Sequence, residues 1–416
     1  MSFRRGGERG CRGRGRGRHY PAPVQCDYFD AGVCRSCTFM GLPYAAQLAD
    51  KDASVRSALA AHVDDALWLE PFSGPESGFR NKAKLVVGGR RGAPALGILA
   101  DRGAVADLTR CGLYEPVLAD AVRALPGVVA RSGLTPYDVA RRSGELKNIL
   151  VTASPDHELM VRFVLRSPGQ LPRLREALQD LRTTLPRATV VTANLLPEHK
   201  AVLEGPEEIV LTEADSLTMR VDDVGLHLRA QSFFQTNTTV ATGLYRQVTD
   251  WVRAVGATSL WDLYCGVGGF ALHALRAGAV RAVRGLEVSP AAVDSANRTA
   301  REMGAAPGTA VFEAGDATQD LGPARDANAS GEPAGTTPGS PEVLVVNPPR
   351  RGIGGDLAAR IEHWPDLRHV VYSSCNVTSL SRDLAAMPSL RVCAARLFDM
   401  FPQSAHHEVA VLLERV

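Results

Sequence analysis

Several features that would place this chain in a familiar class are missing from its sequence. No apolar run comes near the roughly 20 residues that a helix needs to span a bilayer, and the basic N-terminus lacks the apolar segment of a secretory signal. Lysine is scarce, with five residues against 42 arginines, so the abundance of arginine reflects a bias of composition. We therefore expect a cytoplasmic protein with no membrane partner, whose eight cysteines are reduced, metal-bound or catalytic.

The length and charge of the chain suggest a modular organisation. A chain of 416 residues is too long for one ordinary core, so two or three domains are expected. The net charge of +2 is unevenly spread, because residues 1–20 contain seven arginines against the single acid Glu8. We assign residues 1–22 to a disordered Arg/Gly-rich tail, a composition found both in nucleic-acid tethers and in dispensable tails.

The remaining chain shows two patterns. Residues 23–228 mix helical and strand-like segments, which predicts an α+β region. Residues 229–416 alternate strands with helices, which predicts an α/β domain with a mostly parallel sheet and helices on both faces. Within it, residues 322–341 are of low complexity and are expected to form a flexible loop. The elements expected in the first region are a helix with an apolar stripe over residues 44–70, strands within 79–100, a hairpin over 145–165 and a helix over 170–184.

The stretch DLYCGVGGF, residues 262–270, combines a strand with a glycine-rich turn. Such a turn lets the backbone approach a ligand at the N-terminus of the next helix. Glu287 ends the next strand, where an acid can accept hydrogen bonds from ribose hydroxyls. Asp262 and Asp316 end two further strands, and the spacing favours a nucleoside site over three solvated acids. The turn contains neither GxGxxG nor GK[ST], which argues against a dinucleotide and against a P-loop.

The stretch VVNPPRRG, residues 345–352, follows another strand. Asn347 and the two prolines after it make a stiff polar corner at the same sheet edge as the glycine turn. An enzyme that modifies a base needs a pocket of this kind, because the target base must leave its stack to be reached. The corner therefore favours a base-modifying enzyme.

Cys375, in VVYSSCN, follows the next strand and lies at the same edge. Its thiol can be a buried core group, a metal ligand or a nucleophile. A free cysteine has a pKa of about 8.5, so a nucleophile needs help to ionise. Arg350, Arg351 and the helix that begins after Asn376 are candidates for that help. Two other thiols of this half are expected to be inert, Cys265 and Cys393.

A general base is offered by FPQSAHHEVAVLLERV, close to the last strand. His406, His407 and Glu408 stand together there. A carboxylate in a partly dry pocket can act as a base near neutral pH, so Glu408 is a candidate beside the two histidines.

A second group of cysteines lies near the start of the chain. Cys26, Cys34 and Cys37 have the spacing C-x7-C-x2-C, and Cys111 lies far downstream. Four thiolates are the usual ligands of an iron–sulfur cluster or of structural zinc, and the spacing leaves both open. The nearby segment FRNKAK alternates basic residues along a strand, which fits RNA binding or an ordinary solvated face.

Taken together, SFFQTN, DLYCGVGGF, GLEVS, VNPPRRG, YSSCN and DMFP…HHE resemble the RNA uracil-C5 methyltransferases over residues 26–416. The resemblance implies a Rossmann-like domain that uses S-adenosyl-L-methionine. It also implies that Cys375 adds to C6 of the uracil as the nucleophile and that Glu408 is the base. It assigns cofactor contacts to four residues, Gln235, Tyr264, Glu287 and Asn347, and the spacing adds Gly266 and Asp316.

The resemblance also bears on the metal and on the RNA. Ribosomal members of the family carry a 4Fe–4S cluster on four cysteines at matching places, which implies cluster ligands at Cys26, Cys34, Cys37 and Cys111. Members that act on tRNA lack these cysteines. We therefore expect a monomeric enzyme that methylates one uridine of 23S rRNA, with residues 23–228 binding RNA. A tRNA uracil-C5 methyltransferase and a non-catalytic iron–sulfur RNA-binding protein are the alternatives.

Overall fold

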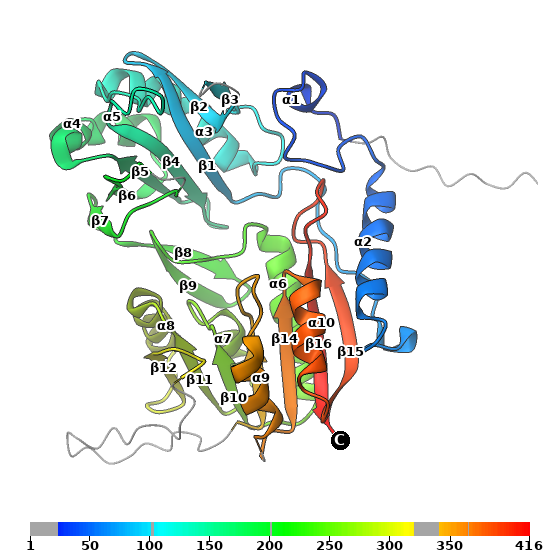
Figure 1. The fold of residues 1–416 in the computed structure, drawn as a ribbon. Coiled ribbons are helices and arrows are strands. Elements are labelled where there is room, and N and C mark those ends of the chain that lie inside the picture. The colour runs from blue at the N-terminus through cyan, green and yellow to red at the C-terminus, as the bar shows by residue number, and fades with distance from the viewer. Residues whose placement is uncertain (1–23, 101–103, 200–201, 320–340, 365) are drawn as a thin grey trace, which may run out of the picture.

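The computed structural model describes most of the chain in two stacked parts (Figure 1). The described residues are 24–100, 104–199, 202–319, 341–364 and 366–416. The Arg/Gly-rich tail, and all but the last residue of the low-complexity segment 322–341, lie outside these ranges. Within the described residues no helix is long and apolar enough to cross a membrane.

The lower part in Figure 1 is built on a seven-stranded sheet. Its strand order is β12 (Ala310–Ala314), β11 (Ala282–Glu287), β10 (Ser259–Leu263), β13 (Val343–Val346), β14 (His369–Ser374), β16 (Glu408–Arg415) and β15 (Leu390–Phe398). The pairs from β12 to β14 are all parallel. Only β16 runs antiparallel to its neighbours, β14 and β15. The expected mostly parallel sheet is therefore confirmed.

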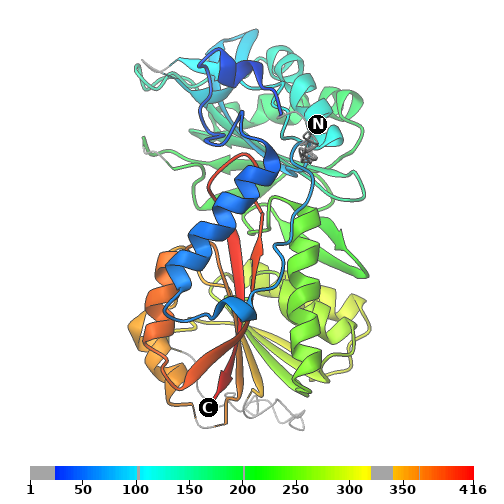
Figure 2. The ribbon, with the colours of Figure 1, turned by 90° about the vertical axis from the view of Figure 1, so that its right-hand side faces the viewer.

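Helices cover both faces of this sheet, because its strands are apolar on both sides. Successive residues such as Val345 and Val346 belong to two different buried clusters. One face packs against α6 (Thr238–Ala254), α7 (Gly269–Arg276) and α8 (Pro290–Glu302). The other face packs against α2 (Tyr44–Leu59), α9 (Gly354–Glu362) and α10 (Val377–Ala385), as Figure 2 shows for α2.

The upper part contains a second seven-stranded sheet of different construction. Its order is β3 (Val105–Asp107), β2 (Ala93–Leu99), β1 (Lys82–Arg90), β4 (Leu146–Ala153), β5 (Leu159–Leu165), β6 (Ala188–Leu195) and β7 (Glu207–Val210). All neighbours are antiparallel except β5 and β6. The helices α3 (Pro116–Ser132), α4 (Leu171–Glu176) and α5 (Leu178–Thr184) share one buried cluster with it. The expected hairpin and the helical segment near residues 170–184 are confirmed.

A two-stranded hairpin, β8 (Ser216–Val221) and β9 (Val224–Arg229), lies between the two sheets. Its apolar residues belong to one buried cluster with Met160 and Val190 of the upper sheet and with helices α6 to α8. The hairpin therefore ties the core of the lower part to the underside of the upper sheet.

The N-terminal helix α2 differs from its expected form. The helix ends at Leu59, and the chain then continues through a short 3₁₀ turn, Asp65–Leu67, into extended segments. Its buried residues are Gln47, Lys51, Val55 and Leu59, so the expected apolar stripe is wrong for half of this face. The segment that follows also lies on the lower sheet, with isolated bridges from Trp68 to Ala395 and from Phe72 to Phe398.

The chain enters and leaves the upper part at neighbouring points. The backbone amide of Asn81 donates to the carbonyl of Thr236 over 2.9 Å, and Arg80 pairs with Asn237 in an isolated antiparallel bridge. The side chain of Asn81 donates to the carbonyl of Gln235 over 2.9 Å. These bonds bring the entry and exit of the upper part side by side.

Candidate active site

The carboxyl ends of the parallel strands meet along one edge of the lower sheet, and the glycine-rich turn lies at its centre. Three residues of this turn have positive φ angles, namely Tyr264 at 61°, Gly266 at 54° and Gly268 at 84°. At Gly268, an added Cβ would lie 2.8 Å from the end of the Leu272 side chain and 3.0 Å from Phe312, and its φ of 84° would strain any other residue. Tyr264 is the non-glycine residue of this turn with a positive φ. Such a backbone is strained, and strain of this kind is often found where a ligand binds.

Glu287 stands opposite this turn at the end of β11. Its carboxylate accepts hydrogen bonds from the amide of Gly266 over 3.2 Å and from the amide of Ser289 over 3.0 Å. A carboxylate has about four acceptor sites, so two remain for hydroxyl groups. The adjacent Val288 is 66% exposed, which leaves an apolar surface beside the acid. An acid that orients hydroxyls next to an apolar surface fits a nucleoside.

The other two strand-end acids differ from each other. Asp262 lies inside β10 and is fully buried, so it is not at the open edge as expected. It accepts from the amide of Ala271 at the start of α7 over 3.2 Å, and burial raises its pKa to about 8. Asp316 accepts from the hydroxyl of Thr318 over 2.7 Å and from its amide, and these bonds lower its pKa.

Asn347 lies beside the glycine turn, and Gln235 lies in the segment before α6. Asn347 follows β13, and its backbone N–H donates to the carbonyl of Leu263 over 3.4 Å, next to the glycine turn. Gln235 is buried in the segment that precedes α6. In the same segment Asn237 donates to the carbonyl of Met400 over 3.4 Å, which ties it to the loop before β16.

Cys375 and Glu408 come together where β14 and β16 pair. Cys375 follows Ser374, the last residue of β14, and Glu408 is the first residue of β16. Ser373 donates to Glu408 Oε1 over 2.6 Å, with both residues buried. Because β16 runs antiparallel, its first residue lies at the same edge as the last residues of the parallel strands.

Burial controls the protonation of both groups. Burial, followed by the charge of Glu408, raises the pKa of the Cys375 thiol, while Arg350 opposes this by its charge and a hydrogen bond. Burial raises the pKa of Glu408 to about 7, and the Ser373 hydroxyl limits the rise. Of the two arginines expected to act on the thiol, Arg350 does so. The charge of Arg351 instead acts on Tyr264, whose pKa burial raises, and on Asp316, whose pKa is lowered mainly by its bonds to Thr318.

The two neighbouring histidines are placed less favourably than Glu408. His406 is largely exposed, and the slight burial of its ring, with the charges of Arg350 and Lys51, lowers its pKa. The ring of His407 contacts the carbonyl of Ala405 over 3.1 Å through Nδ1, and burial lowers its pKa. Glu408, joined to Ser373 on the Cys375 strand, is therefore the better candidate base.

The four N-terminal cysteines gather around one cavity of about 570 Å³ in the upper part. Cys26, Cys34, Cys37 and Cys111 all line it. Burial, followed by the charges of the other three thiols, raises the pKa of Cys37 to about 12. In the part of the chain that the structure describes, no three His, Cys, Asp or Glu side chains are placed to hold a metal ion. The cysteines are thus brought together around a cavity without forming a single-ion site.

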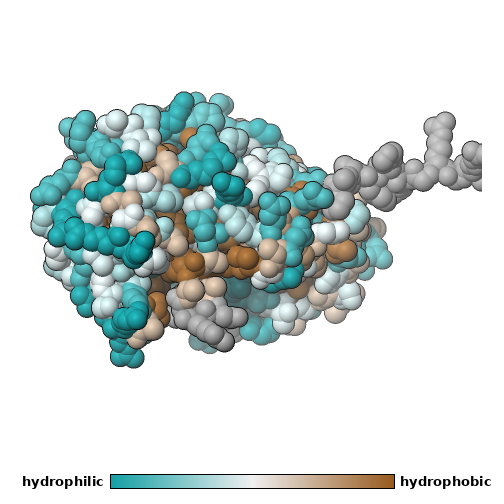
Figure 3. Space-filling model, turned by 90° about the horizontal axis from the view of Figure 1, so that it is seen from above, coloured by the Kyte–Doolittle hydropathy of each residue, from teal (hydrophilic) through white to brown (hydrophobic). Residues whose placement is uncertain are grey.

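The expected basic face on β1 is only partly open. Lys84 is exposed, whereas Lys82 is half-buried and burial lowers its pKa to about 8. Arg80 lies before the strand, and its guanidinium donates to the carbonyl of Lys82 over 3.0 Å. Viewed from above, the upper part is mainly hydrophilic with apolar patches between (Figure 3).

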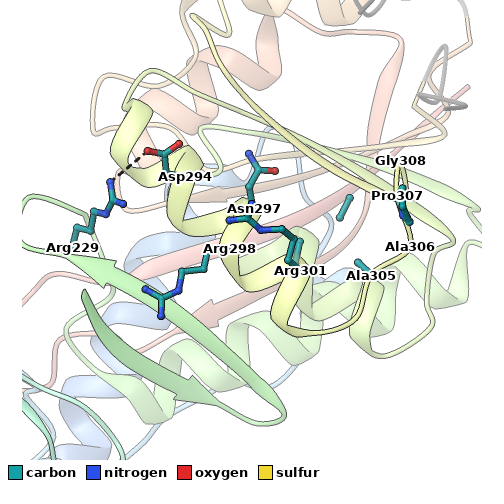
Figure 4. Close-up of a pocket in the computed structure, with 11 residues that line it drawn as sticks. Arg229, Asp294, Asn297, Arg298, Arg301, Ala305, Ala306, Pro307 and Gly308 are labelled. Atoms are coloured by element: carbon teal, nitrogen blue, oxygen red, sulfur yellow. Dashed lines mark hydrogen bonds and ion pairs between the residues drawn. The ribbon is translucent and has the colours of Figure 1, made fainter. Parts of the chain in front are cut away.

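Another cavity, of about 660 Å³, lies between α8, the loop after it and β9 (Figure 4). Its arginines are largely paired with acids: Arg229 lies 3.4 Å from Asp294, and Arg298 lies 2.9 Å from Glu302. None of the site residues expected from the sequence lines this cavity. The candidate active site therefore remains the edge with Cys375 and Glu408.

Sequence reasoning missed three groups that matter here. Ser373 stands inside the quoted YSSCN motif, but its bond to Glu408 depends on strand pairing. Val288 follows the strand-end acid directly, and that position could have identified it. Lys51 forms a buried ion pair with Asp399 over 2.5 Å, and no local pattern signals a contact between residues so far apart.

Comparison with known proteins relates this geometry to a family. Residues 207–416 match the family model described as tRNA (Uracil-5-)-methyltransferase. A relative from Cronobacter sakazakii (strain ATCC BAA-894), 23S rRNA (uracil(747)-C(5))-methyltransferase RlmC, is 45% identical over 94% of this chain and 100% of its own length. The RlmC of Escherichia coli O17:K52:H18 (strain UMN026 / ExPEC) is 44% identical over the same shares.

A solved structure supports the fold. The Pyrococcus abyssi tRNA (uracil-54, C5)-methyltransferase in complex with S-adenosyl-L-homocysteine superposes with a TM-score of 0.73. It is 22% identical and covers 91% of this chain and 85% of its own. The two sheets of this chain therefore have the arrangement of a methyltransferase.

Proposed function

The chain belongs to the RNA uracil-C5 methyltransferase family, and on this premise we propose that it methylates C5 of uracil 747 in 23S rRNA with S-adenosyl-L-methionine as donor. The relatives named for this reaction align over 94% of this chain and their full length. That full-length match supports rRNA over tRNA, although the matching family model is named for tRNA.

One observation carries the chemistry, namely the pairing of β14 with β16 that joins Ser373 to Glu408 beside Cys375. A thiol and a carboxylate at one sheet edge supply a nucleophile and a base. Uracil C5 needs both, because it is a poor nucleophile until another group adds to C6.

The residues then act in sequence. The thiolate of Cys375 adds to C6, and the electrons of the C5–C6 double bond make C5 nucleophilic. When bound, S-adenosyl-L-methionine would supply an electrophilic methyl group on its sulfonium sulfur, and its C–S bond would break as C5 takes the methyl, leaving a neutral thioether. The carboxylate of Glu408 next takes the C5 proton, the C–H electrons restore the double bond, and the bond from C6 to sulfur breaks to release the thiolate.

The thiol must lose its proton before this sequence starts. Burial and the charge of Glu408 raise the pKa of Cys375 in the protein alone. Arg350 hydrogen-bonds to the thiol and supplies the opposing charge, and α10 begins directly after Asn376. We assign Arg350 and the N-terminal end of α10 to stabilising the thiolate.

The donor is expected to lie along the edge next to the glycine turn. Gly266 lets the backbone approach it, Glu287 has two free acceptor sites for ribose hydroxyls, and Val288 offers an apolar surface for the adenine. Tyr264, Asp316, Asn347 and Gln235 complete the proposed set of cofactor residues. Apart from Gln235, each of these follows the end of a parallel strand or lies in the turn.

A 4Fe–4S cluster is proposed for Cys26, Cys34, Cys37 and Cys111. The supporting observation is the cavity that all four thiols line. Around a single zinc ion, with Zn–S bonds of about 2.3 Å, four thiolates would crowd together. A four-iron cubane instead takes one thiolate at each of its four irons and fills a cavity. The cluster would join the loop that contains Cys26 to the segment that contains Cys111.

The RNA target can be tested directly. Purified protein is incubated with the labelled methyl donor and either a 23S rRNA fragment containing uracil 747 or a tRNA transcript. We expect 5-methyluridine only in the rRNA fragment, and only when uracil 747 is present. Methylation of the tRNA transcript alone would establish the tRNA alternative, and methylation of neither would contradict the proposed activity.

A further inference from the structure

The loop that carries the candidate base is held from outside the sheet by α2. This loop, residues 399–407, connects the end of β15 to Glu408. The loop also bonds to Phe72, Glu76 and Asn237, but its buried side-chain contacts with α2 come from residues more than 300 positions away in the sequence. The catalytic sequence proposed above makes no use of these contacts.

A buried ion pair holds the start of the loop. Lys51 Nζ lies 2.5 Å from Asp399 Oδ1, and the two side chains are 1% and 0% exposed. Lys51 also donates to the carbonyl of Phe401 over 3.0 Å. The hydroxyl of Tyr44 donates to the second carboxylate oxygen of Asp399 over 2.7 Å. Each charged group of this pair therefore has a further polar partner, as a buried charge requires.

A reciprocal pair of hydrogen bonds holds the middle of the loop. Gln47 Nε2 donates to Gln403 Oε1 over 2.9 Å, and the backbone N–H of Gln403 donates to Gln47 Oε1 over 3.0 Å. Both side chains are fully buried, and Gln403 has a φ of 67°, which is uncommon for a residue with a side chain. These bonds fix a backbone conformation that the loop would not favour by itself.

The cysteine-containing segment is attached to the same point. The amide of Phe39 donates to the carbonyl of Gln403 over 3.0 Å, and the amide of Met40 donates to that of Cys37 over 3.1 Å. One stretch of chain, from Cys37 through α2, thus contacts the loop at Gln403, Phe401 and Asp399. Glu408 lies at the end of this loop.

We propose that Gln47 and the Lys51–Asp399 pair are positioning residues, which hold the 399–407 loop so that Glu408 can reach the C5 proton of the methylated uracil. This inference rests on the proposed function. Adding the Cys375 thiolate to C6 does not need the base, whereas removing the C5 proton does. Loosening the loop therefore slows the second half of the reaction selectively.

The test follows the covalent protein–RNA adduct in a single turnover, on a denaturing gel, with labelled 23S rRNA fragment and saturating methyl donor. Gln47→Met keeps the side-chain length and removes all its hydrogen bonds. We expect the adduct to form at nearly the wild-type rate and to decay about 10- to 100-fold more slowly, the usual effect of misplacing a catalytic group by about 1 Å.

A second variant covers the case in which Gln47→Met does not fold. Lys51→Met/Asp399→Asn removes both buried charges and keeps an acceptor for Tyr44, and it is expected to slow adduct decay in the same way. The matched control is Val55→Ala, because Val55 is buried on the same face of α2 among apolar residues. It lowers stability without touching the loop, so its ratio of adduct formation to decay should equal that of wild type.

Each outcome is decisive. Slow adduct decay in either loop variant, with a normal ratio in Val55→Ala, supports the positioning role. A normal ratio in all folded variants, with activity reduced only by the loss of folded protein, overturns it. If the wild-type enzyme forms neither adduct nor 5-methyluridine, the proposed function fails instead.

Discussion

The two large sheets both have seven strands in the described part of the chain, but they differ in strand direction. In the lower sheet the strands from β12 to β14 are parallel, so all their carboxyl ends reach one edge. In the upper sheet only β5 and β6 are parallel, and the strand ends alternate between the two edges. A parallel sheet can therefore gather reactive side chains from distant segments, whereas the upper sheet offers faces and loops.

The two groups of thiols follow this difference. Cys375 belongs to the strand-end cluster of the lower sheet and lies near the carboxylate of Glu408. Cys26, Cys34, Cys37 and Cys111 lie on loops next to the upper sheet and around a cavity. On the proposed function, we expect chemistry to depend on the first group and local stability on the second.

The largest effect is expected from Cys375→Ala. Without a group that adds to C6, methylation should fall by at least about 10⁴-fold, as for loss of a covalent nucleophile. Binding of S-adenosyl-L-methionine, measured by calorimetry, should stay within a few fold, because the thiol acts on uracil. Cys393→Ala on β15 is the control and should keep full activity. Normal turnover by Cys375→Ala would remove the nucleophile assignment.

Glu408→Gln should stop the same reaction at a later point. The amide cannot take the C5 proton, so methyl transfer occurs and release stalls. A covalent protein–RNA adduct with a methylated base should accumulate on a denaturing gel. His407→Gln is the comparison and should release its product. If the adduct accumulates in His407→Gln and not in Glu408→Gln, the histidine is the base.

Changing any one of the four N-terminal cysteines to serine should affect metal content and stability and leave binding of the methyl donor unchanged. Protein purified without oxygen should be brown and contain about four irons per chain. A serine variant should lose most of this iron and melt at a lower temperature, because one junction between distant loops is gone. Its affinity for the methyl donor should remain that of wild type. Stoichiometric zinc in place of iron would contradict the cluster proposal.

The smallest expected effect is a dependence of the free energy of unfolding on pH, which reports the protonation of Glu408. Burial raises its pKa from 4.5 to about 7, so the folded protein binds the proton more tightly than the unfolded chain. This group therefore lowers stability progressively as pH rises from about 4.5 to 7, by roughly 3 kcal/mol in total. Glu408→Gln should be more stable than wild type at pH 8 and equal to it near pH 4. Urea denaturation at both pH values measures the difference.

The rate of adduct decay gives the same pKa in kinetic form. Only the carboxylate of Glu408 accepts the proton, so the decay rate should rise from pH 6 and level off above about 7. A decay rate that is constant over this range would show that Glu408 does not limit release.

The sequence was most informative where local rules apply. The spacing between the glycine-rich turn and the acid after the next strand places Gly266 and Glu287 at one edge of the sheet, because parallel strands end at the same edge. The same reasoning failed at Asp262. This residue lies one position before the end of β10, and its side chain is therefore buried in the core and does not reach the sheet edge. The reasoning also failed for α2, where Gln47 and Lys51 are buried. Their partners, Gln403 and Asp399, are distant in sequence, and periodicity cannot reveal such pairs.

Because the chain enters and leaves the upper part at neighbouring residues, near Asn81 and Gln235, such a protein can be assembled from modules. The lower part is made from two separate stretches of chain, because α2 packs on the same sheet as the C-terminal strands. The upper sheet is thus a module inserted into a methyltransferase domain, and its two ends lie side by side. Insertions with neighbouring ends are well tolerated. The module could therefore be exchanged for one with a different RNA preference, while the edge with Cys375 and Glu408 keeps its chemistry.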